Sequence, residues 1–272
     1  MKITFIGGGN MASALIAGLA GQLTAGENIH VVDPNPEQLT RLKDSYGVST
    51  ATEIGPKAGA SDVIVLAVKP QQMREVAAQL MPQLAEAQPL LLSIAAGIRG
   101  ADLSRWLGGY GAIVRTMPNT PALIGQGITG MVAMAGVSDA QKAAAGDIMR
   151  AVGATVWLDD EALIDPVTAV SGSGPAYVFY FIEAMQQAAE ELGLSAEQGK
   201  QLALATFVGA SQLAAQSADE VAVLRERVTS KGGTTYAAIT SMEQAGVKQA
   251  IVDAVKAAAA RGRELGEQLG AD

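Results

Sequence analysis

The glycine-rich segment near the N-terminus has the spacing of a dinucleotide-binding loop. Gly7, Gly9 and Ala12 form a Gly-x-Gly-x-x-Ala pattern directly after an apolar run. In such a loop the first glycine allows a tight turn, the second lets the backbone approach a pyrophosphate, and the small third residue lets the helix pack on the strand. The N-terminus of the following helix offers free N–H groups to the phosphates. Because any tight turn uses glycine, the flanking strand and helix are what favour dinucleotide binding.

Asp33 ends the next apolar run, about 20 residues beyond Ala12, where an acidic side chain accepts hydrogen bonds from a ribose. A carboxylate there favours NADH because it repels a 2′-phosphate. Asn35 and Arg41 lie nearby in the sequence and could accommodate that phosphate if Asp33 turns away. Asp33 could equally form an Asx-turn before Pro34. The preference between NADPH and NADH therefore stays open at this stage.

Three further loops follow expected strands, and ligands of doubly wound sheets bind at the carboxyl ends of the strands. Lys69, followed by Pro70, could face a phosphate or a ribose, or could be an ordinary solvated lysine. Asn119, between two prolines, offers an amide to a nicotinamide or a substrate. The remaining loop consists of Ala95, Ala96 and Gly97.

Two loops rich in glycine and serine or threonine stand out in the second half of the chain. One covers residues 171–177 at a helix entrance, and the other covers residues 230–235. In the second, Gly232 and Gly233 precede two threonines, so backbone N–H and hydroxyl donors would form a small anion pocket suited to a carboxylate, with Lys231 adding charge. Each loop alone is compatible with a linker or a helix cap. Both together, beside a nucleotide domain, favour a substrate site.

Composition excludes several kinds of catalytic site. The 272 residues contain no cysteine, which removes disulfide scaffolds, Cys-zinc sites, iron–sulfur clusters and thiol nucleophiles. The one histidine, His30, falls within an expected strand, so we expect neither a histidine acid/base nor a metal site. Reduction of an imine is compatible with a chain that lacks a histidine acid, because an imine can arrive protonated or take its proton from water. The Thr235 hydroxyl is the candidate partner for the imine nitrogen.

Charge and hydropathy narrow the class of protein. Lys and Arg total 19 and Asp and Glu total 27, a formal net charge of -8, so nucleic acid is not an expected partner. With 49% apolar and 17% charged residues, the chain is too apolar for disorder. Because no apolar run approaches about 20 residues and no signal-peptide pattern is present, we expect a soluble cytoplasmic protein without membrane association.

The first half of the chain alternates short apolar runs with helical patterns. Runs without polar alternation, separated by helices, predict a parallel sheet covered on both faces, and thus an α/β fold. Asn35 is the expected N-cap of a helix that begins at Pro36 and ends at Gly47, with Gln38 completing a capping box. The expected strands are residues 3–6, 29–32, 63–68, 90–94 and 112–116, with 128–134 and 155–158 as possible edge strands.

After about residue 160 the strand-like runs stop and alanine-rich helical patterns continue to the end. We therefore predict domains at 1–160 and 161–272. A capping box at Ser195 predicts a helix to about Gln216, Asp219 is the expected cap of a short helix, and Thr234 or Thr235 the expected cap of another. The final helix, residues 247–269, is apolar around much of its circumference, which predicts burial, for instance between subunits.

Together these segments resemble the pyrroline-5-carboxylate reductase family over nearly the full chain. The glycine loop is shared with many families, whereas the last three matching motifs are specific. The matching motifs are residues 5–11, 67–70, 93–97, 117–121, 172–177 and 230–235.

The resemblance implies an N-terminal Rossmann-type domain and an all-helical C-terminal domain that interlocks with a second subunit. It implies reduction of 1-pyrroline-5-carboxylate to L-proline by NADPH or NADH, the last step of proline biosynthesis. It also implies a homodimer at least, and in some members a larger ring of dimers.

The resemblance also assigns residues. It places the substrate carboxylate on Ser230, Gly233 and Thr234 and the ring nitrogen near Thr235, which is the expected catalytic residue. It places the cofactor on the loops at the strand ends. With the residues inferred from the chain itself, the expected cofactor contacts are Gly7, Gly9, Asn10, Met11, Asp33, Asn35, Ala67, Lys69, Pro70, Ala95, Ala96, Gly97 and Asn119.

Three other functions remain as rivals. A β-hydroxyacid dehydrogenase has a similar layout, but its catalytic lysine and asparagine correspond to Val178 and Ile182 here. A non-catalytic nucleotide sensor would have no need of the carboxylate pocket at residues 230–235. A methyltransferase using S-adenosylmethionine shares glycine loops and a sheet, but it leaves the helical half without a role.

Overall fold

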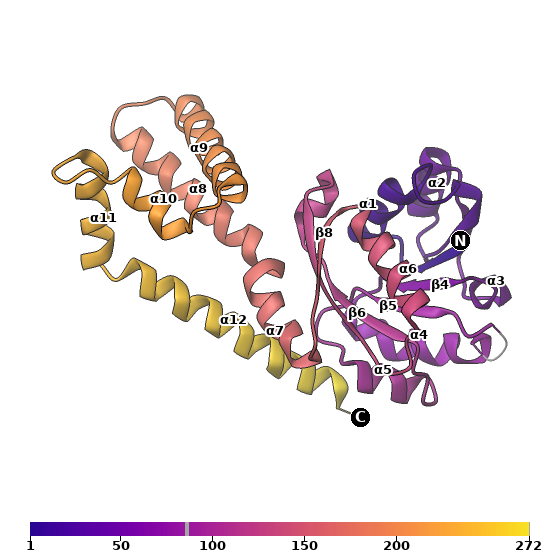
Figure 1. The fold of residues 1–272 in the computed structure, drawn as a ribbon. Coiled ribbons are helices and arrows are strands. Elements are labelled where there is room, and N and C mark those ends of the chain that lie inside the picture. The colour runs from indigo at the N-terminus through magenta and orange to yellow at the C-terminus, as the bar shows by residue number, and fades with distance from the viewer. Residues whose placement is uncertain (85–86, 272) are drawn as a thin grey trace. The chain divides into compact units, whose positions relative to one another are not determined.

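The computed structural model describes residues 1–84 and 87–271, which form two compact units (Figure 1). Unit 1 contains Met1–Ser173 and the C-terminal segment from Ala258, and unit 2 contains Gly174–Ala257. The domain boundary expected near residue 160 stays a prediction. Within the described residues, no helix is both long enough and apolar enough to span a bilayer.

The described part of unit 1 is built on an eight-stranded sheet in the order β3-β2-β1-β4-β5-β6-β7-β8. The first six strands are parallel, β7 runs antiparallel to β6, and β8 is parallel to β7. The order β3-β2-β1-β4-β5-β6 is that of dinucleotide-binding sheets, so the expected α/β fold is confirmed. The strands are β1 (Ile3–Ile6), β2 (Ile29–Val32), β3 (Ser49–Ala51), β4 (Val63–Leu66), β5 (Leu90–Ser93), β6 (Ile113–Met117), β7 (Gly127–Ala133) and β8 (Gly153–Trp157).

Two details of the sheet differ from the sequence-based expectation. β3 was not among the expected strands, since its three residues are each only half-buried and lack a continuous apolar run. β7 was expected at an edge but lies between β6 and β8, so only β8 is terminal on that side. Both strands are defined by pairing with neighbouring strands, β3 with β2 and β7 with β6 and β8, which an apolar run by itself does not show.

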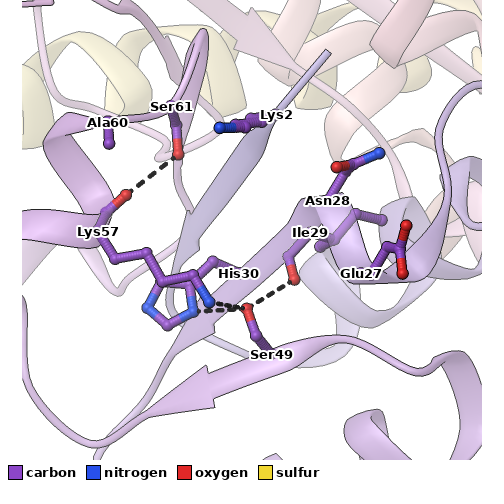
Figure 2. A pocket seen from close by; sticks show the side chains of 9 residues that line it. All are labelled: Lys2, Glu27, Asn28, Ile29, His30, Ser49, Lys57, Ala60 and Ser61. Carbon is purple, nitrogen blue, oxygen red and sulfur yellow. Dashed lines mark hydrogen bonds between the residues drawn. The ribbon is translucent and has the colours of Figure 1, made fainter.

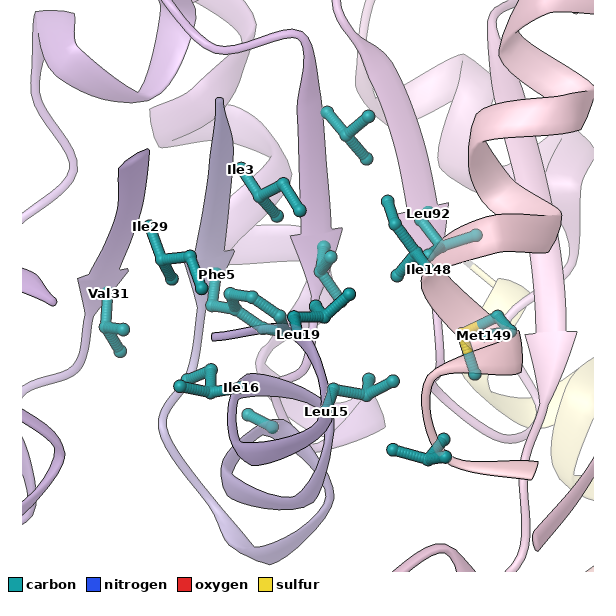
Figure 3. Close-up of a cluster of buried hydrophobic side chains, with 14 of the residues drawn as sticks. Ile3, Phe5, Leu15, Ile16, Leu19, Ile29, Val31, Leu92, Ile148 and Met149 are labelled. Atoms are coloured by element: carbon teal, nitrogen blue, oxygen red, sulfur yellow. The ribbon is translucent and has the colours of Figure 1, made fainter. Parts of the chain in front are cut away.

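Helices cover both faces of the sheet. Buried side chains of α1, α2 and α6 pack on one face together with Phe5 and Leu92 (Figure 3). Those of α3, α4 and α5 pack on the other face with Ile64 and Leu91. This covering explains why β1, β2, β4 and β5 are buried along their whole length. The helices are α1 (Asn10–Leu19), α2 (Pro36–Tyr46), α3 (Pro56–Gly59), α4 (Met73–Leu80), α5 (Gly100–Trp106), α6 (Asp139–Arg150) and α7 (Ile164–Val167), and a π-helical turn follows at Thr168–Gly172.

Unit 2 is entirely helical in the residues described. The predicted capping box is present at Ser195, whose hydroxyl accepts from Gln198 N. Two predicted caps are wrong: Asp219 is not the N-cap of α10 but pairs with Arg227, and Gly233 rather than a threonine is the N-cap of α11. The helices are α8 (Gly174–Glu191), α9 (Ala196–Gln216), α10 (Val221–Arg227), α11 (Thr234–Gln244) and α12 (Val247–Gly270), the last of which continues into unit 1.

Candidate active site

A groove of about 640 Å³ opens at the carboxyl ends of β1, β2 and β4 in unit 1. The fold places the turn after β1, the turn after β2 and the loop after β4 at this edge because the three strands are parallel neighbours. Six of the expected cofactor residues line the groove, namely Gly7, Gly9, Asp33, Asn35, Ala67 and Lys69. The structure therefore brings together residues that are up to about sixty positions apart in the sequence.

The glycine loop has the backbone geometry that its pattern predicts. Gly7 has φ of 101°, and a Cβ there would lie 2.5 Å from the Ala67 carbonyl oxygen, so only glycine fits. A Cβ at Gly9 would meet nothing within 4 Å, and no side chain caps the N-terminus of α1. The bare surface at Gly9 and the uncapped helix N-terminus fit the pyrophosphate of a dinucleotide.

Asp33 is bound to the protein's own backbone through both carboxylate oxygens. Its Oδ1 accepts from Asn35 N at 2.8 Å, which closes an Asx-turn, and its Oδ2 accepts from Gly8 N at 2.7 Å. Of the two interpretations of Asp33, the turn is thus present in the structure. Asn35 is the N-cap of α2, as expected, and accepts from Glu37 N at 3.0 Å.

Gln38 does not complete the expected capping box. Its side-chain amide instead donates to the Gly8 carbonyl oxygen and, at 3.1 Å, to Ser13 Oγ. The sequence predicts that the Gln38 side chain bonds the backbone of the N-cap Asn35. Folding instead brings the glycine loop within reach of the Gln38 amide. The contact of Gln38 with the glycine loop is one that the sequence alone did not reveal.

The other expected cofactor residues of unit 1 lie outside the lining of the groove. Asn10 is exposed and Met11 half-buried in the first turn of α1, and Pro70 begins a short 3-10 helix after Lys69. Asn119 is buried, and its amide donates to Ser171 O at 3.2 Å and accepts from Ile128 N at 2.9 Å. Ala95, Ala96 and Gly97 follow β5, with Gly97 at φ of 75°.

Several groove residues were missing from the expectation. One face of α4 and the residue before it line the groove, through Gln72, Glu75, Val76 and Gln79. Their i, i+3, i+4, i+7 spacing could have indicated that they share one helix face. The loop after β3 was missed together with that strand, and it contributes Thr52, Glu53 and Ile54.

In unit 2, the expected substrate residues gather at the N-terminus of α11. Gly233 is the N-cap, no side chain caps this helix, and Gly233 N donates to Ser230 O at 3.0 Å in the preceding turn. Ser230, Thr234 and Thr235 are exposed, and Gly232 has φ of 80°. An uncapped, exposed helix N-terminus flanked by hydroxyls can bind a carboxylate, and the assignment of these four residues stays a prediction.

The single histidine lies at the opposite edge of the sheet from the groove, near the start of β2. Its imidazole borders a cavity of about 110 Å³, and its Nδ1 lies 3.0 Å from Ser49 Oγ, which also accepts from Lys57 Nζ (Figure 2). Burial, followed by the nearby Lys57 charge, lowers the pKa of His30. In the part of the chain that is described, no three His, Asp or Glu side chains are grouped closely enough to bind a metal ion.

Comparisons with known families match both parts of the chain. Residues 2–97 match the model described as NADP oxidoreductase, coenzyme F420-dependent. Residues 161–265 match the model described as pyrroline-5-carboxylate reductase dimerisation.

Full-length relatives share the same name. The pyrroline-5-carboxylate reductase of Pseudomonas aeruginosa is 48% identical over 269 residues, which cover 99% of this chain and 98% of the relative. That of Haemophilus influenzae is 40% identical and covers 97% of each chain.

Solved structures agree over the whole length. A pyrroline-5-carboxylate reductase from Coxiella burnetii superposes with a TM-score of 0.91 at 41% identity, covering 97% of this chain and 98% of that one. The pyrroline carboxylate reductase of Plasmodium falciparum, solved with NADP bound, gives 0.86 at 32% identity and covers 98% of each chain. On this full-length agreement in sequence and fold, the chain belongs to the pyrroline-5-carboxylate reductase family.

Proposed function

We propose that this protein reduces 1-pyrroline-5-carboxylate to L-proline, with NADPH or NADH as hydride donor, in the last step of proline biosynthesis. The observation that carries the proposal is the open glycine loop at the groove of unit 1, found in a chain whose full length matches this reductase family. When bound, the reduced nicotinamide supplies the hydride that converts the C=N carbon of the imine into a CH₂ group.

The chain's own residues would bind and orient both reactants. Gly7 and Gly9 let the backbone approach the pyrophosphate, and Lys69 lies on the groove wall as a cation for phosphate or ribose. Ser230, Gly233 and Thr234 would hold the substrate carboxylate at the N-terminus of α11. The Thr235 hydroxyl would contact the ring nitrogen, which arrives protonated or takes its proton from water.

Assembly is part of the proposal. The helices of unit 2 expose many large apolar side chains, and the matched family model describes dimerisation. We propose a homodimer as the minimal active form, with a larger ring of dimers as an extension, and a cytoplasmic location. Light scattering on the purified protein would give the subunit count, and cell fractionation would give the location.

The direct test is an assay of purified protein with reduced nicotinamide and 1-pyrroline-5-carboxylate. We expect loss of reduced-nicotinamide absorbance only when the imine is added, and formation of L-proline in equal amount. Running NADPH and NADH side by side measures the preference. No oxidation with either cofactor would contradict the proposed function.

The Thr235→Ala variant tests the assigned nitrogen contact. We expect lower turnover with unchanged cofactor affinity, because the hydroxyl is assigned to the imine and not to the dinucleotide. Ser241→Ala, which removes an exposed hydroxyl further along α11, is the matched control and should retain full turnover. Equal turnover in both variants would remove Thr235 from the mechanism.

A further inference from the structure

The backbone of Gly8, between the two glycines of the motif, is bound at both its N–H and its carbonyl group by side chains of the segment after β2. Gly8 N donates to Asp33 Oδ2 at 2.7 Å. The Gly8 carbonyl oxygen accepts from Gln38 Nε2 and from Ser13 Oγ, the latter at 3.2 Å. Gln38 also donates to Ser13 Oγ at 3.1 Å, so the three side chains form one connected network.

Packing also holds this part of the loop in place. Gly8 is buried, and a Cβ there would lie 3.2 Å from Leu42 Cδ1 and 3.5 Å from Asp33 Oδ2. On the side of β1, Gly7 N donates to Val32 O at 2.8 Å. The turn thus has little room for another conformation.

The network leaves the ligand-facing part of the loop free. Asp33 and Gln38 use the N–H and C=O groups of Gly8, whereas Gly9 is exposed and α1 has no side-chain cap. The backbone N–H groups at the start of α1, which suit a pyrophosphate, are therefore held in position and are not occupied by the network. A loop already in its bound conformation avoids an ordering cost when the ligand binds.

We propose that Asp33 and Gln38 are positioning residues for the nicotinamide cofactor, which act by fixing the backbone of Gly8 through its N–H and its carbonyl group. The inference rests on the proposed function for the identity of the ligand, a nicotinamide dinucleotide. It assigns Asp33 to the loop, since its Oδ1 accepts from Asn35 N and its Oδ2 accepts from Gly8 N. Both residues then serve NADH and NADPH alike, because the pyrophosphate is common to the two.

Calorimetric titration of each reduced cofactor into purified variants tests this without any imine, so a failure of the proposed substrate would not affect the result. Asp33→Ala and Gln38→Ala should each raise Kd for NADH and NADPH by about five- to tenfold, the usual effect of losing such hydrogen bonds. Asp33→Asn keeps one acceptor and should fall between wild type and Asp33→Ala for both cofactors. In assays with the imine, KM for the cofactor should rise while kcat stays unchanged.

The control is Thr40→Ala, which removes an exposed hydroxyl that donates to Pro36 O within α2, and should leave both Kd values unchanged. The double variant Asp33→Ala/Gln38→Ala should bind about as weakly as the weaker single variant, because both side chains fix the backbone of one residue, Gly8. Fully multiplicative losses would overturn the shared mechanism. A shift of more than about tenfold toward NADPH in Asp33→Ala would show a ribose contact instead. If a folded variant keeps the wild-type Kd for both cofactors while its unfolding midpoint falls, the network has only a structural role.

Discussion

The two units bury their apolar residues to very different extents. In unit 1, Ile3, Phe5 and Leu15 are fully buried, and four strands are buried at every position. In unit 2, the 21-residue helix α9 buries only Gly199 and Ala203, and α10 and α11 bury no residue. Unit 1 covers its sheet with helices from its own chain, whereas the helices of unit 2 leave their apolar faces open.

The difference indicates what each unit requires to be stable. Exposed large side chains in unit 2 include Phe179 at 61%, Tyr180 at 71% and Leu192 at 85%. An apolar cavity of about 330 Å³ lies between α8 and α12, bordered by Tyr177, whose buried hydroxyl has no hydrogen-bond partner within the described chain. Apolar surface on this scale marks an interface, which agrees with the proposed dimer.

The largest expected effect comes from placing a charge on an apolar face of unit 2. Leu213 on α9 is 60% exposed in the chain, so Leu213→Asp would be nearly neutral if that face met water. In the proposed dimer it would bury an unpaired carboxylate, so we expect dissociation and a loss of activity above about tenfold. Light scattering and the reductase assay measure both.

Met81→Asp is the matched control in unit 1, where the side chain is 45% exposed. This variant should keep the size and activity of the wild type. A Leu213→Asp protein of wild-type size would mean that this face of α9 is not an interface.

The next effect is expected in the core of unit 1. Leu15 is fully buried on α1 beneath the sheet (Figure 3). Leu15→Ala should lower the free energy of unfolding by about 2–5 kcal/mol because it leaves a cavity that the sheet cannot fill. Urea denaturation measures the change. Met81→Ala, at an exposed site, should stay within about 0.5 kcal/mol of wild type, and equal costs in the two variants would contradict the burial contrast.

A smaller effect distinguishes two glycines of α12, both in the part that belongs to unit 1. A Cβ at Gly262 would lie 3.7 Å from Asp165, so Gly262→Ala should stabilise the protein by about 0.5–1 kcal/mol through helix propensity. A Cβ at Gly266 would lie 3.3 Å from the Gly97 carbonyl oxygen, so Gly266→Ala should lose that gain to crowding. Thermal unfolding compares the two variants. Equal stabilisation would mean that α12 does not pack tightly against the loop after β5.

The smallest effect concerns pH. Burial and Lys57 lower the pKa of His30 below its ordinary value of 6.5, and Lys2 and Glu27 face the same cavity (Figure 2). Because the unfolded chain then binds the proton more readily, this contribution to stability is present above pH 6.5 and is lost as pH falls through the lowered pKa. Denaturation across this range should show a shallower decline for His30→Gln. An identical pH dependence in both proteins would contradict the lowered pKa.

Much of the local structure could be predicted because its causes lie within a few residues. Gly47 adopts the left-handed conformation that ends α2, and Ser195 and Gln198 form their capping box, as their patterns indicate. The continuous apolar runs correctly predicted β1, β2, β4 and β5, because a strand that is covered on both faces has apolar side chains on both. The glycine spacing likewise predicted the turn at Gly7.

Predictions were wrong where a second partner competes for the side chain of an expected capping residue. Gln38 has the position of a capping residue, but its amide bonds Gly8, thirty positions earlier in the chain. Asp219 has the residue type of a cap, but it pairs with Arg227 at the other end of α10. The residue types at a helix start do not show which of these partners the side chain takes.

The sequence by itself determined the kind of elements, the dinucleotide loop and the family, because propensity, apolar period and motif spacing are properties of neighbouring residues. Only the tertiary structure decided which groups meet. It placed Asp33 and Gln38 on the backbone of Gly8, and it joined buried Arg115 to Glu161 at 2.6 Å. The physical reason is that a hydrogen bond forms with whichever partner folding brings within reach, and the order of the strands sets that choice.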